Sequence, residues 1–526
     1  IFFQGGVAFN RGVKSAFEKV TGKKVTVPPH QDVMGAVGAA IIAMEDGDGE
    51  SSFRGFDLRD VDYELSTFEC KKCSNRCEIH KVSIEGQPPL HYGSRCGRFD
   101  DQKKYKEGQD LPKLFEEREQ ALLNTYSRPT PSQPLGVTVG MPRALTFFDI
   151  YPFWKAFFTE LGCEVVLSDP TNKEIISRGA DHLTTETCFP IKVAHGHVAN
   201  LLDKDVDYIF VPSVINLEHE AEGIVHSYLC PLVQSLPYLL RTAFAEEYDE
   251  GELPLLSPIL HFERGRDHIN KKLQSMAGMF NVPSSRVKRA TDEAWKALDS
   301  FRRSCRERGE EILNNLGEDE IALAIMSRPY NGCDPGMNLA IPDKLRDLGV
   351  VAIPIDYLPL DLPGIEDEFP HMYWKYGQKI LAAGRCVADN PKLHAVYITN
   401  FRCGPDSFIS KFFDRILGEP YLTLEIDEHS ADVGAITRCE AFLDSIQGAG
   451  QRRSERRARG EDLFFDLQER SEDIKVYIPY MDDHGLMMQA VLRANGVDAE
   501  ALTMRDAQSV ELGRQVTTGK ECLPCI

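Results

Sequence analysis

The sequence of 526 residues contains no apolar run of about 18 residues, the length that a transmembrane helix requires. It also has no excess of positive charge, because 60 Lys and Arg are outnumbered by 81 Asp and Glu to give a net charge of −21. So acidic a chain repels nucleic acid and anionic membranes unless a local basic patch dominates. We therefore predict a cytoplasmic protein with neither a nucleic acid nor a membrane as partner.

Familiar catalytic motifs are absent as well. The sequence has no nucleophile elbow, Walker loop or dinucleotide fingerprint, so no catalytic residue is assigned. Its composition, 42% apolar and 27% charged, is ordinary for a globular protein, and its length favours about three to four domains. The 14 cysteines are the unusual feature. In so large a chain, closely spaced cysteines are typical of metal or redox sites rather than disulfides.

From residue 135 onward, strand patterns alternate with helix patterns. We expect strands near 135–139, 164–167, 208–211, 321–326, 350–355, 395–399 and 421–426. Strands that alternate with helices predict βαβ units and mostly parallel, Rossmann-like sheets. The predicted fold class is therefore α/β with several subdomains, in which ligands bind at the carboxyl ends of strands.

Four cysteines are grouped before this region, as Cys70-x2-Cys73-x3-Cys77 followed by Cys96. Thiolates two and three residues apart can converge on one ion, and a distant fourth completes a tetrahedron. The same spacing suits an iron–sulfur cluster, so the spacing leaves zinc and a cluster as alternatives. The remaining interpretation is a chance group of free thiols.

Three further cysteines, Cys188, Cys230 and Cys403, each stand just before a predicted helix. A helix N-terminus stabilises a thiolate, and its N–H groups can also donate to cluster sulfides. If the three converge in one cleft, they could hold a cubane with one iron left open for substrate. The alternative is that each is a buried packing residue. His195 and His197, on the helix after Cys188, could serve such a site, but we interpret them as a polar helix face.

The segment 136–190 is paralleled by 474–524, with Cys522 in the place of Cys188. The interval from Pro142 to Cys188 is 46 residues (188 − 142), and that from Pro479 to Cys522 is 43 (522 − 479). We predict that the two segments form similar βαβ units. Cys522, together with Cys525, would then begin a second and incomplete cluster site.

Near the start of the chain, Gly5 and Gly6 follow a short strand pattern, and Asn10 stands one helical turn later. Glycines at such a junction let the backbone approach a nucleotide closely. An ordinary strand-to-helix turn is the alternative. Both ends of the sequence cut through predicted elements, so we expect it to be part of a longer protein.

The opening segment resembles a known family. The motifs that carry this resemblance are Phe3-x-Gly5-Gly6-Val7-Ala8-x-Asn10-x-Gly12-Val13, Val25-x-Val27-Pro28-Pro29-His30 and Met34-Gly35-Ala36-x-Gly38-Ala39-Ala40. They are similar to the C-terminal end of activases of the acetate-kinase/actin-like ATPase superfamily, which drive 2-hydroxyacyl-CoA dehydratases and benzoyl-CoA reductases. The resemblance implies that the Gly-Gly segment lies against adenosine. The phosphate-binding loops would precede Ile1, so we do not expect ATP hydrolysis by this chain alone.

Most of 135–526 carries a second resemblance. Its motifs are Cys188-Phe189-Pro190-x-Lys192-x-x-His195-Gly196-His197, Arg328-Pro329-Tyr330 with Asp334-Pro335, Asn400-x-x-Cys403-Gly404-x-Asp406 and Glu428-His429-Ser430-Ala431-Asp432-x-Gly434-Ala435-x-Thr437-Arg438. They resemble large acyl-CoA dehydratase activase homologues fused to a dehydratase-subunit-like, double-cubane-like module. The resemblance implies a [4Fe–4S] cluster on Cys188, Cys230 and Cys403. Cys333 departs from the pattern, and we expect an inert thiol.

These resemblances imply a function in anaerobic metabolism. An ATP-driven activase would pass low-potential electrons to the cubane, which would act on a small-molecule substrate such as a CoA thioester. The chain would then be a component of an ATP-dependent reductase or dehydratase system, as a homodimer or in an activase-coupled assembly. The alternative, from the residues alone, is a structural zinc-binding scaffold or regulator without catalysis.

The predicted organisation follows the chain. It consists of an activase fragment with an actin-like ATPase fold (1–44), a linker (45–60), the four-Cys metal module (61–110), a connecting helix (111–134), a first α/β subdomain (135–315), a second α/β subdomain (316–450) and the truncated start of a repeated α/β unit (470–526).

Overall fold

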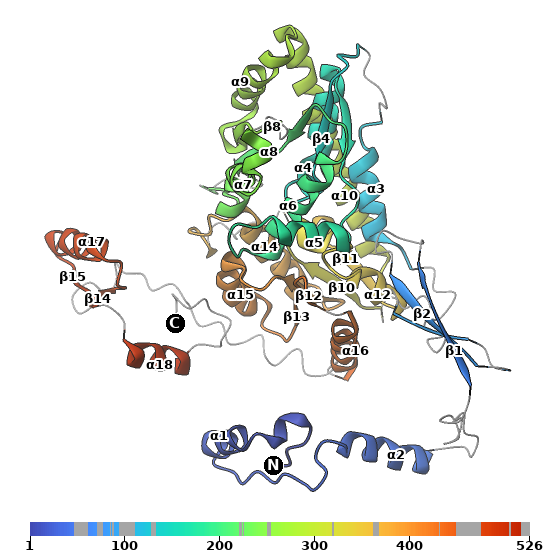
Figure 1. Cartoon of the computed structure of the whole chain (residues 1–526). Coiled ribbons are helices and arrows are strands. Elements are labelled where there is room, and N and C mark those ends of the chain that lie inside the picture. The colour runs from blue at the N-terminus through green and yellow to red at the C-terminus, as the bar shows by residue number, and fades with distance from the viewer. Residues whose placement is uncertain are drawn as a thin grey trace. The chain divides into compact units, whose positions relative to one another are not determined.

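The computed structural model (Figure 1) describes residues 1–46, 62–70, 77–84, 86, 89–93, 111–127, 133–219, 224, 226–249, 254–317, 320–360, 368–430, 432–448, 475–503 and 506–516. The chain divides into two compact units. The first consists of Ile1–Ser66 and His80–Leu90, and the second consists of Thr67–Ile79 and His91–Ile526. The helices and strands of the α/β subdomains belong to the second unit.

The N-terminal segment contains an isolated β-bridge and three short helices. Phe2 pairs with Thr26 in a parallel bridge. The 3-10 helix η1 and the helices α1 and α2 follow, at Gly6–Phe9, Arg11–Thr21 and Met34–Asp46. Further along the chain, a three-stranded sheet has the order β1-β2-β3, with strands Tyr63–Glu69, Glu78–Ile84 and Leu90–Tyr92.

The first α/β subdomain is built on a four-stranded sheet with the order β5-β4-β6-β8. Its neighbouring strands all pair in parallel, and β7 forms a separate parallel pair with β9. The strands are β4 Thr138–Met141, β5 Glu164–Leu167, β6 Tyr208–Phe210, β7 Ser213–Asn216, β8 Leu255–Leu256 and β9 Ile259–His261.

The second subdomain repeats this arrangement, with the order β11-β10-β12-β13 and parallel pairing throughout. The strands are β10 Ala322–Met326, β11 Val351–Pro354, β12 Leu393–Thr399 and β13 Leu422–Glu425. In both sheets the first strand in sequence lies between the second and the third. β10 is buried along its whole length, as expected of a parallel strand covered on both faces. The predicted α/β class with mostly parallel sheets is confirmed.

Helices connect and cover these strands (Figure 1). They are α3 Leu114–Asn124, α4 Phe147–Leu161, α5 Lys173–Asp181, α6 Phe189–Leu202, α7 Pro231–Ala243, α8 Ala245–Asp249, η3 Phe262–Arg264, α9 Arg266–Ala277, η4 Gly278–Phe280, α10 Ser284–Asn315, α11 Pro329–Gly332, α12 Ile341–Asp347, η5 Ile355–Tyr357, α14 Lys375–Asp389, α15 Gly404–Leu417 and α16 Asp432–Gly448.

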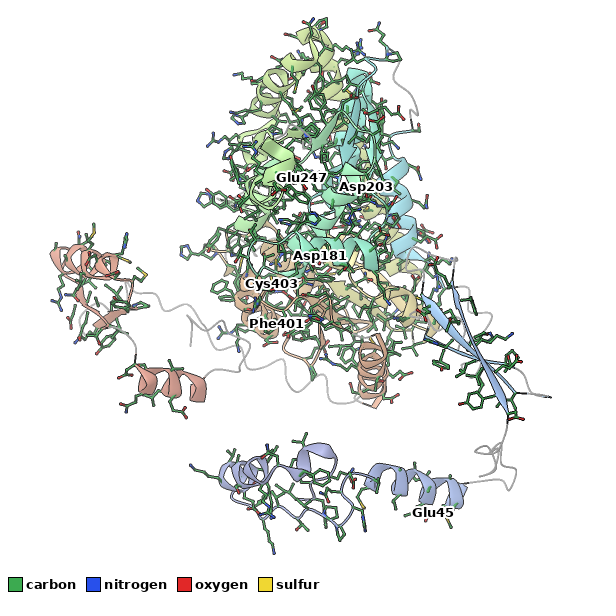
Figure 2. The ribbon with its side chains drawn as sticks, in the orientation of Figure 1. Glu45, Asp181, Asp203, Glu247, Phe401 and Cys403 are labelled. Atoms are coloured by element: carbon green, nitrogen blue, oxygen red, sulfur yellow. The ribbon has the colours of Figure 1, made fainter. Side chains whose placement is uncertain are left out.

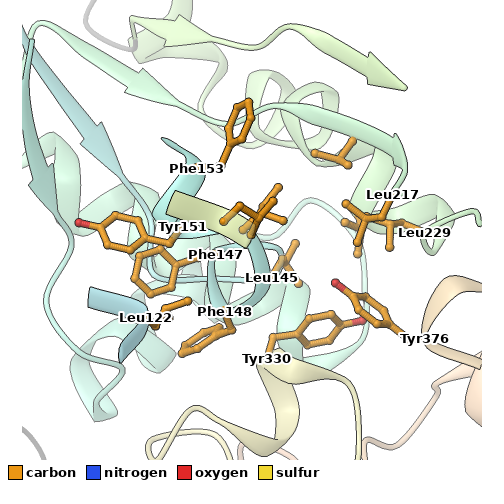
Figure 3. Packing of buried hydrophobic residues seen from close by; sticks show 14 of the residues in the cluster. Leu122, Leu145, Phe147, Phe148, Tyr151, Phe153, Leu217, Leu229, Tyr330 and Tyr376 are labelled. Atoms are coloured by element: carbon orange, nitrogen blue, oxygen red, sulfur yellow. The ribbon is translucent and has the colours of Figure 1, made fainter. Parts of the chain in front are cut away.

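The largest hydrophobic cluster is centred on α4, whose sequence is apolar on nearly every face. Phe153, Phe157 and Phe158 are completely buried, and α4 packs along the long helix α10. Phe153 contacts the rings of Phe262 and Trp295 edge-on, with centroids 5.9 and 4.9 Å apart. A helix that is apolar all round must lie inside the protein, and Figure 3 shows part of the cluster that surrounds it.

Helices α5 and α6 cross at two glycines. A Cβ added to Gly196 would lie 1.8 Å from the carbonyl oxygen of Ile175, and one added to Gly179 would lie 2.0 Å from that of Lys192. Both distances are far below a normal contact between these atoms. The absence of side chains at these two positions therefore allows the helices to approach this closely.

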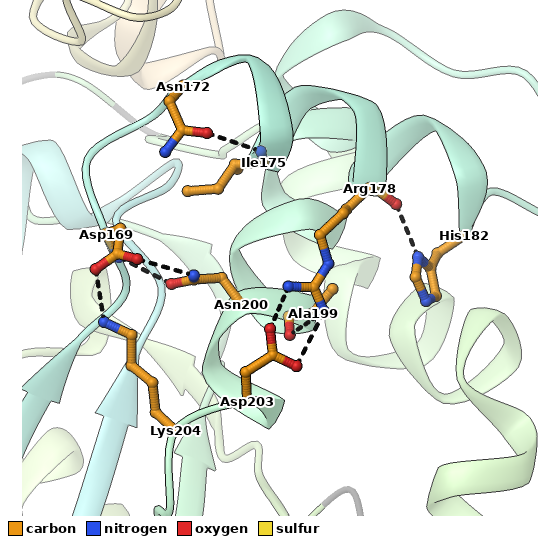
Figure 4. Close-up of polar contacts among 9 residues, drawn as sticks. All are labelled: Asp169, Asn172, Ile175, Arg178, His182, Ala199, Asn200, Asp203 and Lys204. Atoms are coloured by element: carbon orange, nitrogen blue, oxygen red, sulfur yellow. Dashed lines mark hydrogen bonds and ion pairs between the residues drawn. The ribbon is translucent and has the colours of Figure 1, made fainter. Parts of the chain in front are cut away.

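Polar contacts hold α5 in place around this crossing (Figure 4). Asn172 caps the helix by accepting a hydrogen bond from the Ile175 N–H at 3.0 Å. In the last turn, Arg178 donates to the Ala199 carbonyl at 2.8 Å and forms an ion pair with Asp203. These contacts join α5 to α6, the helix that begins at Cys188.

We predict that Gly196→Ala destabilises the protein by about 1–3 kcal/mol, because the new methyl group forces α5 away from α6. Thermal unfolding followed by circular dichroism measures this loss. Gly278→Ala is the matched control, since a Cβ at Gly278 meets no atom within 4 Å. Equal unfolding temperatures for the two variants would contradict the proposed close contact.

Residues 475–501 form a parallel βαβ unit, and the similarity of this unit to 136–190 stays a prediction. β14 (Lys475–Ile478) and β15 (Asp498–Ala501) pair in parallel and are connected by α17 (Asp483–Ala494), with α18 at Ala507–Val516. Lys475 pairs with Asp498, 23 residues later (498 − 475), whereas Thr138 pairs with Glu164, 26 residues later (164 − 138). The two spacings differ by three residues (26 − 23), and the two Pro-to-Cys intervals also differ by three residues (46 − 43). Cys522 and Cys525 lie outside the described residues.

Candidate functional site

Three cysteines cap three different helices. Cys188 is the N-cap of α6, Cys230 that of α7 and Cys403 that of α15. Each helix has a proline in its first turn, where the missing N–H costs no hydrogen bond and the fixed φ favours helix initiation. The predicted position of each cysteine just before a helix is therefore observed.

The three cysteines lie together. All are free thiols of intermediate exposure, and they line one pocket with a volume of about 240 Å³. Figure 2 shows Cys403 among its neighbours. The other residues lining the pocket are Leu145, Pro190, Ile191, Pro231, Leu232, Val233, Arg328, Tyr330, Asn400, Arg402, Gly404 and Pro405.

Tyr330 lies where the thiols converge. Burial raises the pKa of its hydroxyl well above the ordinary value, and the nearby Arg328 opposes this shift. Negative charge on Cys188, Cys230 or Cys403 would raise the same pKa further. Arg328, Tyr330 and all three cysteines line the same pocket.

Arg328 makes the most direct polar contact with the group. Its Nη1 donates to Cys403 Sγ at 2.6 Å, and its Nη2 lies 2.8 Å from Asp406 Oδ1. Asp406 is held in turn by hydrogen bonds from Thr399 Oγ1 and from the Tyr397 hydroxyl. The guanidinium is thus fixed between a thiol and a buried carboxylate.

Burial controls the protonation of two of these thiols, Cys188 and Cys403. It raises the pKa of Cys403 to about 12, even though Arg328 acts in the opposite direction. It also raises the pKa of Cys188, an effect that the N–H of Ile191 reduces. Both thiols are therefore protonated at neutral pH until a cation that binds thiolate displaces their protons.

The position of Cys188 along the chain differs from the prediction. Cys403 follows β12 directly, and Cys230 follows β7 after a loop. Cys188 does not follow a strand, because α5 lies between β5 and Cys188. The sequence pattern missed α5, although Asn172 is a helix-capping residue type that could have revealed its start.

The three donors of this pocket are thiols, which are ligands of thiolate-bound metal centres. Within the described part of the chain, no group of three or more His, Cys, Asp or Glu residues is arranged to hold one metal ion. One zinc ion with Zn–S bonds near 2.3 Å would need sulfurs only about 4 Å apart. In a cubane each thiolate binds a different iron, so the sulfurs stand farther apart. The pocket also far exceeds the ~10–15 Å³ that one water molecule requires.

A second pocket of about 220 Å³ shares Cys188, Ile191, Leu232 and Arg402 with the first. Its remaining lining residues are Leu183, Thr184, Thr185, Glu186, Thr187, His195 and Leu239. Apolar side chains therefore meet hydroxyl, carboxylate, imidazole and guanidinium groups beside Cys188. This mixture is typical of sites for small molecules.

The two histidines of α6 do not form a polar surface face, contrary to our interpretation of the sequence. His195 is 2% exposed, and its Nδ1 lies 2.8 Å from the carbonyl oxygen of Ile191. His197 is completely buried between Ser168 Oγ and Thr171 Oγ1, at 2.8 and 2.9 Å from its ring nitrogens. His195 lines the second pocket, whereas His197 belongs to a buried hydrogen-bond network.

The other cysteines of the α/β body do not line this pair of pockets. Burial raises the pKa of Cys333 to about 12, and the expected inert role of this thiol stays a prediction. The cysteines buried in the hydrophobic clusters are Cys163, Cys305, Cys386 and Cys439.

Two of the four cysteines of the four-Cys module lie among the described residues. Cys70 and Cys77 are buried with Ile79, and the Cys70 N–H donates to the Cys77 carbonyl at 2.8 Å. They stand at the end of β1 and the start of β2, so the β-sheet brings these two cysteines together. Cys73 and Cys96 lie outside the described residues.

The predicted nucleotide-binding segment is exposed. Gly5 has a φ of 89° and a Cβ there, or at Gly6, would meet no atom within 4 Å. Asn10 Oδ1 accepts from the N–H groups of Gly12 and Val13 at 2.9 and 3.3 Å. The Asn10 side chain therefore caps α1, a structural role that the residue type also predicts.

Residues 138–358 match the family model described as "CoA enzyme activase uncharacterised domain". The matched region contains Cys188, Cys230 and Arg328, whereas Cys403 follows it. This part of the chain is therefore similar to a domain of CoA enzyme activases. A search of curated proteins found no match to the chain. None of the described helices combines the length and the apolar character that a membrane span needs.

We predict that His197 makes the fold sensitive to acid. Burial lowers its pKa to about 3, whereas an unfolded chain titrates near 6.5. Between these values the unfolded state binds more protons, so stability falls as the pH decreases from about 6.5 toward 3. In His197→Gln, which has no titrating group at this position, the unfolding temperature should decrease less between pH 7 and pH 5. Identical decreases in both proteins would contradict this role.

Proposed function

We propose that this chain is an iron–sulfur protein of the 2-hydroxyacyl-CoA dehydratase/activase type, with Cys188, Cys230 and Cys403 as ligands of a [4Fe–4S] cluster. The observation that carries the proposal is the convergence of three thiols, from the starts of three helices, on one pocket. The match of residues 138–358 to a CoA enzyme activase domain supports it.

The surrounding residues suit such a site. When bound, a cubane with three protein ligands supplies one-electron chemistry at low potential and an iron that is open to a small substrate. The three cysteines stand at the first turns of α6, α7 and α15, and the positive end of a helix dipole stabilises negative charge. Tyr330 and the prolines Pro190, Pro231 and Pro405 also line the pocket, and charge interactions are stronger where such groups displace water.

ATP and electrons would come from an activase component. The resemblance of residues 1–44 to the end of an actin-like ATPase suggests that this component is fused or bound to the chain. A homodimer or an activase-coupled assembly would bring the two functions together, and the substrate would be a small molecule such as a CoA thioester. Cys522 and Cys525 would begin a second cluster site in the repeated unit.

Cysteine replacement tests the cluster. We predict that the protein purified without oxygen contains about four iron and four sulfide for this site, and that Cys188→Ser, Cys230→Ser and Cys403→Ser each lose this iron and the associated EPR signal. Circular dichroism should show a retained fold. Cys333→Ser, a cysteine outside the pocket, is the control and should keep its iron. Full iron content in all three pocket variants would refute the proposal.

A structural zinc site is the second candidate, and it concerns the four-Cys module alone. The specific observation is that the buried Cys70 and Cys77 are joined by a backbone hydrogen bond, which suits a tetrahedral site completed by Cys73 and Cys96. If the chain contained zinc without iron or sulfide, it would be a zinc-binding scaffold or regulator rather than an electron-transfer protein.

We predict that Cys70→Ser and Cys77→Ser remove one zinc per chain and leave the iron content unchanged. Loss of the ion should also make residues 61–110 sensitive to proteases, because so small a module depends on its metal for folding. Metal analysis and limited proteolysis measure both effects, with Cys333→Ser again as control. Retained zinc in both variants, or loss of iron instead, would exclude this assignment.

A further inference from the structure

Arg328 is a buried cation that touches the candidate site. It follows β10, caps α11 and is only 5% exposed. A buried guanidinium is costly unless hydrogen bonds and an opposite charge compensate for the lost water. Asp406 provides that charge, at 2.8 Å from Nη2 and 3.2 Å from Nη1.

One guanidinium nitrogen serves two acceptors. Nη1 donates to Cys403 Sγ at 2.6 Å as well as to Asp406. The ion pair with Asp406 fixes the orientation of the side chain, because the carboxylate is itself held by Thr399 and Tyr397. The hydrogen bond to the sulfur is therefore built into the fold and does not depend on a mobile surface side chain.

We propose that Arg328 is a positioning residue that raises the reduction potential of the cluster proposed above, through its hydrogen bond to Cys403. This inference rests on the proposed function. Reduction adds one negative charge to a cluster and its thiolates, and a hydrogen bond to a ligand sulfur stabilises that charge. The effect is large in a buried site, where water does not screen it.

Two other charges bear on this assignment. The negative charge of Asp406 offsets the positive charge of the guanidinium. The proposed rise in reduction potential therefore comes mainly from the N–H group that donates to the sulfur and less from net charge. Arg402 lines the same pocket, but its side chain is 55% exposed and pairs with Glu186 at 3.3 Å. Solvent screens a charge of this kind, which makes Arg402 the matched control for Arg328.

The test is a redox titration of the cluster-loaded protein, followed by EPR. We expect Arg328→Met to lower the equilibrium constant for reduction about tenfold, which corresponds to about 59 mV for one electron. Arg402→Met should leave the potential unchanged. Arg328→Lys should give an intermediate value, because it retains the positive charge but loses the planar fork that holds both acceptors.

A lone Arg328→Met change leaves Asp406 buried without its cation, which can impair folding. The double variant Arg328→Met with Asp406→Asn removes both charges and should show the same lowered potential. If neither of these proteins loads a cluster, Arg328→Lys decides the question. An unchanged potential in the loaded Arg328 variants, or an equal shift in Arg402→Met, would overturn the inference and leave the proposed function intact. A wild-type protein without iron and sulfide would overturn both.

Discussion

Every α-helix begins with backbone N–H groups that no carbonyl of the same helix can accept. In this protein α6, α7 and α15 all begin at one pocket, and a cysteine occupies the N-cap of each. A neutral thiol is a weak hydrogen-bond acceptor for these N–H groups, whereas a thiolate or a sulfide is a strong one. This convergence places partial positive charge around a cavity of about 240 Å³ and makes an anionic, sulfur-containing occupant physically favourable.

The site exists only while two sheets remain docked, because Cys188 and Cys230 belong to the first subdomain and Cys403 to the second. Two polar contacts, one buried and one half-buried, join the subdomains. Lys192 of α6 pairs with Glu428 after β13, and Thr171 before α5 donates to Asp334. Ion pairs and hydrogen bonds that are buried in this way fix relative orientation more than they add net stability. Their geometric role is to keep three sulfurs in one cavity.

A second set of contacts also joins the two subdomains. Arg118 of α3 is 1% exposed, donates to the carbonyl of Phe148 at 2.8 Å and pairs with Asp356. Burial alone would raise the pKa of Asp356, but Arg118 and Lys379 together hold that pKa far below its usual range. The helix at 111–134, expected only as a connection, thus helps to hold the first and second subdomains together.

Local patterns in the sequence predicted much of this arrangement. Apolar runs such as Ala322–Met326 predicted buried parallel strands, and Cys-Phe-Pro or Cys-Gly-Pro predicted helix starts, because each depends on neighbouring residues alone. The burial of His197 and the contact between Arg328 and Cys403 depend on residues that are distant in the sequence. No local pattern shows that Arg328 reaches a residue 75 positions later. The chemical environment of such a residue cannot be predicted from its neighbours in the sequence. It is known only once the structure shows which distant residues it contacts.

The protonation of the thiols helps to distinguish between the kinds of chemistry that the pocket supports. A cysteine that attacks a substrate needs a lowered pKa and a reactive thiolate at neutral pH. Burial has the opposite effect here, since the pKa of Cys403 is raised to about 12 and that of Cys188 is also raised. Covalent catalysis by Cys188 and Cys403 is therefore disfavoured. A metal centre binds thiolates by displacing the protons itself, so the same burial that suppresses nucleophilic attack is compatible with the role of ligand.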